Sequence, residues 1–379
     1  MDIRGQHTIV EKITILIDNQ ELSSWSDVEV TLSIDSFDTV QFTAPFEPSR
    51  KDLRAAFQPF SYKPIQVKLN GDLLFTGTMV GVDPSCDSDS GTVSVTAYAK
   101  PGVLCDCTVP GNYAVQTQMR DSAGRPVVAV GTYPRAFKDI TLENITAQLC
   151  APFGVAFQFR EPSGAPFKYV AIEPEETIHS FLVELAKQRG LLITNLADGS
   201  MLFWKSRSGG VPVVQFAEGE PPLTSVRATF SPQAYFSHVT GFIPAKNRKI
   251  GSTFTVPNKF AGKFFRPHAC KFDDTEKGDA PAATNAKLGR MFANAASYAI
   301  EDLPTWRDPK GQIWNPNTSI TLRAPSAMIY TESELMIRNV HLKQTADKVS
   351  ASLDLCLPGV FSGKVPDTLP WLEDAPSNA

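Results

Sequence analysis

The sequence predicts a multidomain, mainly β protein in which an α/β domain separates two small β-barrels. Three observations predict this fold class. The chain of 379 residues is too long for one compact core, so we expect two to four domains. Phe is abundant at 24 residues and Pro at 29, while long amphipathic helical patterns are few, which favours β-rich folds with many turns. Period-two alternation dominates both ends of the chain, whereas helical and strand patterns alternate in the middle.

Residues 8–104 are predicted to form the first β-barrel domain. Apolar residues recur at every second position from Ile13 to Ile17 and again from Val28 to Ile34, as expected for half-buried strands. Asn70-Gly71 stands between two alternating segments and is the strongest short hairpin signal. Five or six strands joined by short turns and one longer link indicate a small barrel or sandwich.

The α/β domain is predicted at residues 105–208, and its most regular unit runs from Glu175 to Trp204. Pro174 suits a first helical position, where its missing N–H costs nothing. Gly190 suits the left-handed residue that closes a helix. After a short strand, Asp198-Gly199 signals a turn into a second strand. The predicted helix has one apolar face, made by Ile178, Phe181, Leu182 and Leu185.

The earlier part of this domain gives a weaker signal. Residues 111–137 are rich in Gly, Pro and small polar residues, and we expect a long ordered loop there. A loop of that length in a compact domain is usually functional or contacts a partner. Thr141 is predicted to cap a short helix that Gly154 ends, before a further strand.

The β pattern resumes in residues 222–362, which we expect to form the second β-barrel domain. An Ala-rich segment around residues 282–299 carries apolar residues at helical spacing and predicts a helical insertion. Residues 363–379 are Pro-rich and polar and are expected to form a C-terminal tail.

Composition and charge argue against several classes of protein. The net charge of −4 disfavours general binding to nucleic acid or anionic membranes. We expect no membrane insertion, and we expect synthesis in a cytoplasm, because no apolar stretch reaches transmembrane length and no secretory signal is present. Scattered cysteines predict buried free thiols rather than a disulfide framework or a zinc site: Cys86, Cys105, Cys107, Cys150, Cys270 and Cys356.

The sequence offers no active site. Glu175 and Glu176 are too close in sequence to act as a carboxylate pair, because adjacent helical residues point about 100 degrees apart. Stabilising a helix start is the simpler interpretation of both. His179, beside the apolar helical face, is expected to be a partly exposed histidine. Nucleophile-elbow, P-loop, dinucleotide-binding and HExxH motifs do not occur in the sequence. We therefore predict no catalytic, cofactor-binding or metal-binding residues, and no cofactor.

A basic run in residues 246–271, interleaved with Phe, is the one charged feature that predicts a contact. Such a pattern suits a strand of nucleic acid. It also suits an intersubunit face, because acidic residues from Asp273 to Asp279 follow directly and supply counter-charges on a neighbouring chain. We favour a protein contact, with six candidate residues: Lys246, Arg248, Lys249, Lys259, Lys263 and Arg266.

Sequence motifs in three separate regions resemble one protein family. Residues 176–191 read E-T-I-x-x-F-L-x-x-L-A-x-x-x-G-L, and a strand, D-G and L-F follow. Residues 70–77 read N-G-x-L-x-F-T-G, before L-C-D-C at 104–107. Residues 313–358 contain I-W-N-P-N-T-S-I-T-L, E-L-M-I-R-N-V and V-S-A-S-L-D-L-C-L-P. In their order and spacing, these motifs resemble those of the baseplate hub proteins of contractile-tail, Mu-like phages. The resemblance covers roughly residues 8–362.

This resemblance implies a structural protein rather than an enzyme. Hubs of this family form a homotrimeric ring with two similar barrels, called tube domains, in each chain. The ring adapts the sixfold tail tube to the threefold central spike. It leaves a channel through which DNA passes without sequence-specific binding. The implied partners are two further copies, the spike, the tail tube, and the tape-measure and wedge baseplate proteins. The implied location is the tail baseplate of the virion.

Two alternatives remain open from the sequence. A cell-wall-degrading hydrolase of the same tail would need a paired-carboxylate cleft or a metal triad, and the sequence contains neither pattern. A phage-like bacteriocin or secretion device would use a homologous hub, which the sequence does not separate from that of a phage tail.

Overall fold

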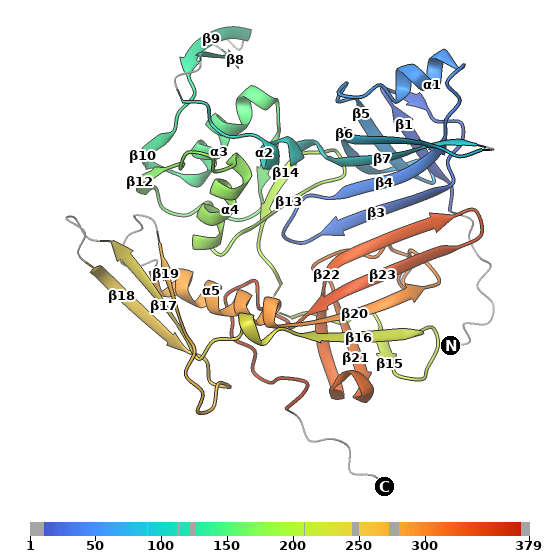
Figure 1. The fold of residues 1–379 in the computed structure, drawn as a ribbon. Helices are drawn as coiled ribbons and strands as arrows, with labels where there is room; N and C mark the ends of the chain where they lie inside the picture. Colours follow the sequence, from blue (N-terminus) through green and yellow to red (C-terminus); the bar gives the residue numbers. More distant parts are fainter. Residues whose placement is uncertain are drawn as a thin grey trace.

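A computed structural model describes residues 11–88, 90–111, 114–120, 126–207, 209–244, 250–272 and 280–372. Figure 1 shows two β lobes, one drawn in blue and one in orange and red, with a mixed α/β region in green and yellow beside both. The predicted mainly β class with an α/β middle is confirmed.

The first lobe is built from strands with alternating burial. In β1, β3 and β4 every second residue enters the core, which is the reason these segments fold as strands. Asn70 and Gly71 both take positive φ, 52° and 93°, in the hairpin between β5 and β6, as predicted. The bounds are β1 Ile13–Ile17, β2 Gln20–Glu21, β3 Asp27–Ser33, β4 Thr39–Pro45, α1 Lys51–Ala56, β5 Pro64–Leu69, β6 Asp72–Cys86 and β7 Gly91–Ala99.

The second lobe has a large aromatic core. Trp306 is fully buried, and its indole Nε1 donates hydrogen bonds to the carbonyl oxygens of Ser350 at 2.9 Å and Lys343 at 3.2 Å. The buried polar atom of this side chain is thereby satisfied. The bounds are β15 Gln215–Ala217, β16 Ser225–Phe230, β20 Ala296–Leu303, β21 Ser319–Ala324, β22 Ile329–Thr345 and β23 Val349–Cys356.

Both lobes have the same strand order. Hydrogen-bonded neighbours run β3-β4-β7-β6-β5-β1 in the first lobe and β16-β20-β23-β22-β21-β15 in the second. With the two-residue β2 set aside, each lobe places its strands in the order second, third, sixth, fifth, fourth, first. The pairings correspond in direction except the last, which is antiparallel for β1–β5 and parallel for β15–β21. The two lobes are therefore structural repeats without a repeat in sequence.

The two lobes are joined through their backbones. β22 pairs antiparallel with β3, from Asn339 opposite Ser33 to Thr345 opposite Asp27. This pairing links both lobes into one 13-stranded sheet. Within the described strands the pairings run through both lobes and close neither of them, so the two predicted barrels share a single sheet.

The predicted helix of the middle region is present as α4, Ile178–Gln188, but its start differs from the prediction. Pro174 and Glu175 lie outside the helix, and Glu175 has a positive φ of 70°. Thr177 is the N-cap residue, because its side-chain oxygen accepts a hydrogen bond from the N–H of Ser180 at 3.1 Å. The Thr177 cap therefore sets the helix start, rather than Pro174 and the acidic residues that lie between the two. Gly190 ends the helix with φ 66°, as predicted.

The rest of the middle region contains three small sheets, among them the β8–β9 pair described below, and two further helices. Thr141 caps α3 and Gly154 is left-handed after it, as predicted. β11 and β13 flank β14, and β10 pairs with β12. The bounds are α2 Val103–Asp106, β10 Ala136–Ile140, α3 Leu142–Cys150, β11 Phe157–Phe159, β12 Phe167–Ala171, β13 Leu192–Asn195 and β14 Met201–Trp204.

The prediction of a long ordered loop at residues 111–137 is wrong. β8 Ala114–Arg120 and β9 Pro126–Thr132 pair antiparallel there, from Ala114 opposite Thr132 to Arg120 opposite Pro126. Val and Thr residues in both segments favour strands and outweigh the Gly and Pro residues that flank them.

A fourth small sheet lies beside α5 in Figure 1, where β17 His238–Pro244 pairs with β18 Ile250–Pro257 and β19 Pro267–Lys271. The helix α5, Ala280–Ala295, packs against β17 and β18 and also contacts α4. These elements interrupt the second lobe between β16 and β20. The division of the chain into domains at 8–104, 105–208 and 222–362, with a tail at 363–379, stays a prediction.

The loop between β3 and β4, residues 33–38, fastens the first lobe to β13. Asn195 bonds Asp38 twice: its Oδ1 accepts from the Asp38 N–H at 2.8 Å, and its Nδ2 donates to the Asp38 carboxylate at 2.9 Å. Thr194 donates through Oγ1 to the Ser33 carbonyl at 2.7 Å. Burial raises the pKa of Asp38 to about 7, although hydrogen bonds from Ser33 and Asn195 oppose the shift.

The same loop also contacts β22 of the second lobe. The Ile34 N–H donates to the Arg338 carbonyl at 3.0 Å, and the Arg338 guanidinium pairs with Asp35 at 3.2 Å. Six residues of one loop therefore hold all three parts of the molecule.

The substitution Asn195→Ala should lower the free energy of unfolding by about 2–4 kcal/mol, because it removes both hydrogen bonds that Asn195 makes with buried Asp38 and leaves the carboxylate only the bond from the Ser33 N–H. Urea unfolding followed by Trp fluorescence measures this loss. Asn144→Ala, on the exposed face of α3, is the matched control and should change stability by less than about 0.5 kcal/mol. Equal stability of the two variants would contradict the role given to this loop.

His341 lies at the contact between β22 and β3. Its Nε2 is 3.2 Å from an Asp354 carboxylate oxygen, and its Nδ1 is 3.6 Å from Glu29 and 3.2 Å from the Thr31 hydroxyl. The hydrogen bond to Asp354, followed by the charges of Asp354 and Glu29, raises the pKa of His341 above 6.5 against the effect of burial. The protonated ring therefore stabilises the joint between the lobes.

We expect His341→Gln to make stability less dependent on pH. Because the folded pKa is raised, the contribution of His341 is fully present below its unfolded pKa and is lost as pH rises through the folded value. The wild-type advantage should shrink by up to about 1 kcal/mol between about pH 6 and pH 8. His238→Gln, outside this joint, serves as the control in parallel urea titrations. A constant difference across this range would rule out the assigned role.

Candidate interaction surfaces

The structure describes three of the six predicted contact residues, all in or beside the segment that joins β18 to β19. Lys259 Nζ lies 3.7 Å from the Asp367 carboxylate and 4.9 Å from the Phe260 ring centroid. Arg266 donates from its guanidinium to the Gln233 carbonyl at 3.2 Å and lies over the Phe236 ring. Lys263 is exposed. Two of the three side chains are thus engaged with their own chain.

The other three candidates, Lys246, Arg248 and Lys249, lie outside the residues that the structure describes, as do Asp273 to Asp279. Aromatic side chains are exposed close to the described candidates: Phe265 is 78% exposed and Phe264 40%. Exposed rings beside cations suit a protein interface. The assignment of the basic run as a contact surface therefore stays a proposal.

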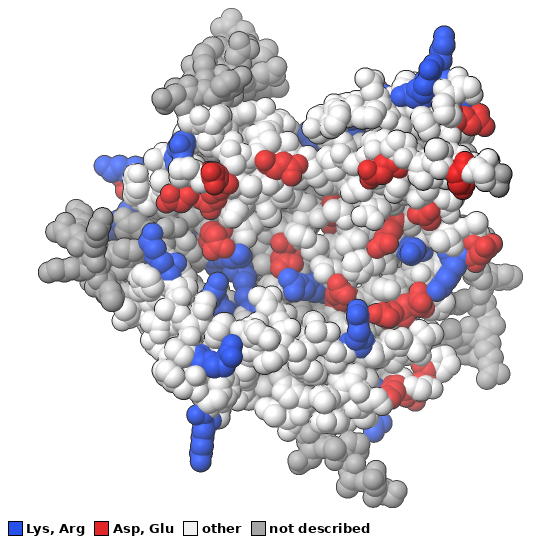
Figure 2. Space-filling view, in the orientation of Figure 1, with Lys and Arg blue, Asp and Glu red and all other residues white. Residues whose placement is uncertain are grey.

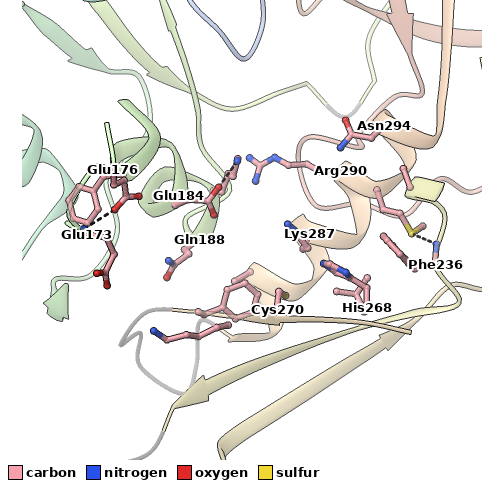
Figure 3. A pocket seen from close by; sticks show the side chains of 18 of the residues that line it. Glu173, Glu176, Glu184, Gln188, Phe236, His268, Cys270, Lys287, Arg290 and Asn294 are labelled. Atoms are coloured by element: carbon pink, nitrogen blue, oxygen red, sulfur yellow. Dashed lines mark hydrogen bonds and ion pairs between the residues drawn. The ribbon is translucent and has the colours of Figure 1, made fainter. Parts of the chain in front are cut away.

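A cleft of about 460 Å³, which the sequence did not predict, separates α4 from α5 and the β17–β19 sheet (Figure 3). α4 contributes Glu184 and Gln188, and α5 contributes Lys287 and Arg290. Figure 3 shows Glu173 and Glu176 at one end and Lys287 and Arg290 at the other. The cleft is therefore polar, with acidic and basic ends.

At the basic end of the cleft, Arg290 is buried and two carboxylates, Asp35 and Glu184, act on its charge. The Arg290 guanidinium donates to the Leu191 carbonyl at 3.3 Å, and burial lowers its pKa to about 10, against the charges of Asp35 and Glu184. Glu184 is already paired with Lys187 at 2.6 Å. Burial, and next the charge of Lys287, lower the pKa of His268. The cleft suits a polar peptide segment better than a chain of phosphates, because carboxylates line its other end.

The cleft offers no reactive constellation. Glu176 accepts a hydrogen bond from the backbone N–H of Glu173 at 3.1 Å. Across the described ranges, no group of three or more His, Cys, Asp or Glu side chains is placed to hold a metal ion. No helix in those ranges is long and apolar enough to cross a membrane. His179 is partly exposed, as predicted, and burial lowers its pKa to about 4.

Four of the six cysteines differ from the prediction of buried thiols. All six are free, but only Cys150 and Cys356 are buried, Cys107 and Cys270 are half-buried, and Cys86 and Cys105 are exposed. Cys86 is exposed because it lies at the end of β6, where the strand extends beyond its neighbour β5. On the face drawn in Figure 2, acidic and basic side chains are interspersed over both lobes, so this face carries no large field of one sign.

Comparisons with known proteins agree with the sequence motifs. Residues 129–205 match the family described as baseplate hub protein gp44-like, second domain. Baseplate hub protein gp44 of Escherichia phage Mu is 26% identical over 344 residues, which cover 87% of this chain and 83% of that protein. The resemblance to hub proteins of Mu-like phages is thereby confirmed.

Two solved structures share the fold over nearly the whole chain. The 43 kDa tail protein of prophage MuSo2 from Shewanella oneidensis superimposes with a TM-score of 0.70 at 22% identity, covering 92% of this chain and 99% of that one. A tail protein from Neisseria meningitidis MC58 gives a TM-score of 0.71 at 14% identity, covering 93% and 98%. The arrangement of both lobes and the middle region is therefore shared with phage-type tail proteins.

Proposed function

We propose that this chain is the baseplate hub of a contractile phage tail and acts as a structural protein without catalytic activity. In this role three copies form a ring that joins the sixfold tail tube to the threefold central spike. The similarity to the Mu hub protein over 87% of the chain supports the assignment. The proposed location is the virion baseplate, after synthesis in the host cytoplasm.

The shared strand order of the two lobes is the observation that carries this proposal. A ring of three copies presents six lobes, and a sixfold partner needs six similar surfaces. Two lobes with one strand order, set side by side by the β22–β3 pairing, meet this need within a single chain. The elements β17–β19 and α5 are inserted only in the second lobe. Because each chain carries them once, a ring of three copies would carry them three times, so the side of the ring on which they lie would have threefold symmetry.

The further partners follow from the same geometry. The tail tube would contact the lobes, the spike would contact the threefold side, and the tape-measure and wedge baseplate proteins would contact the remaining surfaces. DNA would pass through the central channel without sequence-specific contacts, in keeping with a net charge of −4. The hub of a phage-like bacteriocin or secretion device would use the same arrangement.

The alternative from another class is a cell-wall-degrading hydrolase of the tail. It would require two carboxyl groups facing each other across a cleft, or a metal triad. The cleft between α4 and α5 favours neither, since Glu176 bonds the Glu173 backbone and Glu184 bonds Lys187.

We expect the purified chain to have the mass of a trimer and to leave cell wall intact. Size-exclusion chromatography with light scattering measures the mass, and a zymogram on cell-wall substrate measures hydrolysis. Lysozyme is the positive control for clearing. A monomer that clears the substrate would favour the hydrolase instead.

A triple charge reversal of Lys246, Arg248 and Lys249 to Glu should reduce assembly of the hub into tails if the basic run is a protein contact, because like charges would then face each other. Lys348→Glu, on the second lobe, is a single-site control, since its partner Asp302 is intramolecular and exposed. Counting completed tails by electron microscopy measures assembly. Normal numbers with the triple variant would remove the basic run from the interface.

A further inference from the structure

Two cations of α5 reach into the cleft between α4 and α5 with capacity for a further anion. Lys287 is exposed to the cleft, and its ammonium group forms no ion pair with any described residue. Arg290 lies one helical turn further along, on the same face of α5. Within the described part of the chain its guanidinium donates one hydrogen bond, to the Leu191 carbonyl at 3.3 Å. Figure 3 shows both side chains extending from α5 toward α4.

The carboxylates nearest to these cations already have partners of their own. Glu184 pairs with Lys187 at 2.6 Å, and Asp35 pairs with Arg338 at 3.2 Å. Their charges act on Arg290, but neither forms an ion pair with it. Each of these carboxylates therefore balances a cation other than those of α5, and this end of the cleft keeps a net positive charge.

The middle of the cleft contains a buried amide without a partner. Gln188 of α4 is 6% exposed, and its Oε1 is buried without a hydrogen-bond partner among the described residues. An unsatisfied buried acceptor lowers stability. A rotation of the terminal amide, whose torsion is broad, turns it toward the cleft. There the N–H and C=O of a peptide group would bond the amide N–H and oxygen of Gln188.

The far end of the cleft is acidic, and apolar side chains also line it. Glu173 is exposed, and its carboxylate forms no ion pair with a described residue. Glu176 lies beside it in Figure 3. The apolar lining residues are Phe181, Phe236, Phe272 and Met291. Apolar walls with a few convergent polar groups are typical of ligand sites.

This combination favours a polypeptide over a simple anion or a phosphate chain. An ion would use the basic end alone and would leave the Gln188 amide and the acidic end unmatched. A row of phosphates would meet repulsion from Glu173 and Glu176. A volume of about 460 Å³ lies within the range of pockets for small ligands, so the cleft takes a short segment rather than a folded domain.

We propose that the cleft binds a short polypeptide segment of a partner protein that carries an acidic side chain and, a few residues away, a basic one. The acidic side chain lies against Lys287 and Arg290, and a peptide group of the segment bonds Gln188. The basic side chain faces Glu173 and Glu176. This site goes beyond the proposed hub function, because all its groups belong to one chain and binding requires no ring.

Cys270 provides a native reporter for occupancy of the cleft. It lines the cleft and is half-buried, and its thiol donates to the Thr240 carbonyl at 3.7 Å. A bound segment would cover this thiol and slow its alkylation by iodoacetamide, which is uncharged. Cys86, exposed at the end of β6, lies outside the cleft and is the internal control. Because burial raises the pKa of Cys270, alkylation is followed at about pH 8.5 and read at each cysteine by mass spectrometry.

Capped hexapeptides that contain one Asp and one Lys, with the other positions randomised, are the probe. We expect them to slow alkylation of Cys270 in a saturable manner and to leave Cys86 unchanged. The same peptides with Asn in place of Asp should require about tenfold higher concentrations for half protection, because a charge-assisted contact is lost. Sodium acetate and inorganic phosphate, at the same concentrations, should protect little.

Two substitutions assign the protection to the cleft. Lys287→Gln should raise the half-protecting concentration about fivefold or more. Gln188→Leu should raise it about threefold while leaving the melting temperature unchanged or higher, because the substitution removes an unsatisfied buried group. Lys310→Gln, exposed between β20 and β21, is the matched control and should bind as the wild type does.

Three outcomes would overturn the proposal. No protection by the Asp peptides, or equal protection by the Asn peptides, would exclude recognition of an acidic segment. Equal protection by acetate or phosphate would reduce the cleft to a site for simple anions. Unchanged protection in folded Lys287→Gln would place the peptide elsewhere. All three leave the hub role standing, since trimer mass and tail assembly are measured separately.

Discussion

The backbone ladder between β22 and β3 is the interaction on which the rest of the structure depends. It joins two lobes that are far apart in sequence into one sheet, and it sets the angle between them. Hydrogen bonds of a strand ladder are directional, so the lobes cannot rotate freely as two domains on a flexible linker would. The residue 33–38 loop then ties both lobes to β13 through Thr194, Asn195 and Arg338.

This arrangement explains how one chain presents two similar surfaces in a fixed relation. A sixfold partner requires that neighbouring lobes repeat at regular angles, and a rigid ladder provides such an angle. The inserted β17–β19 sheet and α5 break the likeness between the lobes without disturbing their shared strand order. In the ring that we propose, one side would then follow sixfold symmetry and the other threefold symmetry.

Several charged side chains of this protein form hydrogen bonds or ion pairs within their own chain. Lys259 and Arg266, which the sequence marks as contact residues, bond Asp367 and Gln233 of their own chain. Arg290 in the cleft bonds the Leu191 carbonyl at the start of the β13 segment and so connects α5 to the middle region. The exposed Arg227 of β16 likewise pairs with Glu301 of its own chain, at 3.2 Å.

The sequence by itself determined the class of structure and many local features. Alternation predicted the strands of both lobes, Asn70-Gly71 predicted a hairpin, and Thr141 and Gly190 marked helix ends, because such signals depend on residues close in the chain. The start of α4 was missed because Thr177 is a stronger cap than the Pro and acidic residues before it. The β8–β9 hairpin was missed because Gly and Pro masked its strand pattern.

Only the tertiary structure decided how these pieces pair. The repeat of strand order is a property of the pairing between strands, which local sequence patterns do not specify. The β22–β3 ladder joins residues about 300 positions apart, as the contact of His341 with Thr31 illustrates, and local periodicity carries no information about such partners. The same holds for the edges of β6 and β16 that have no described neighbour. An open strand edge can be recognised only when the pairing of the surrounding strands is known.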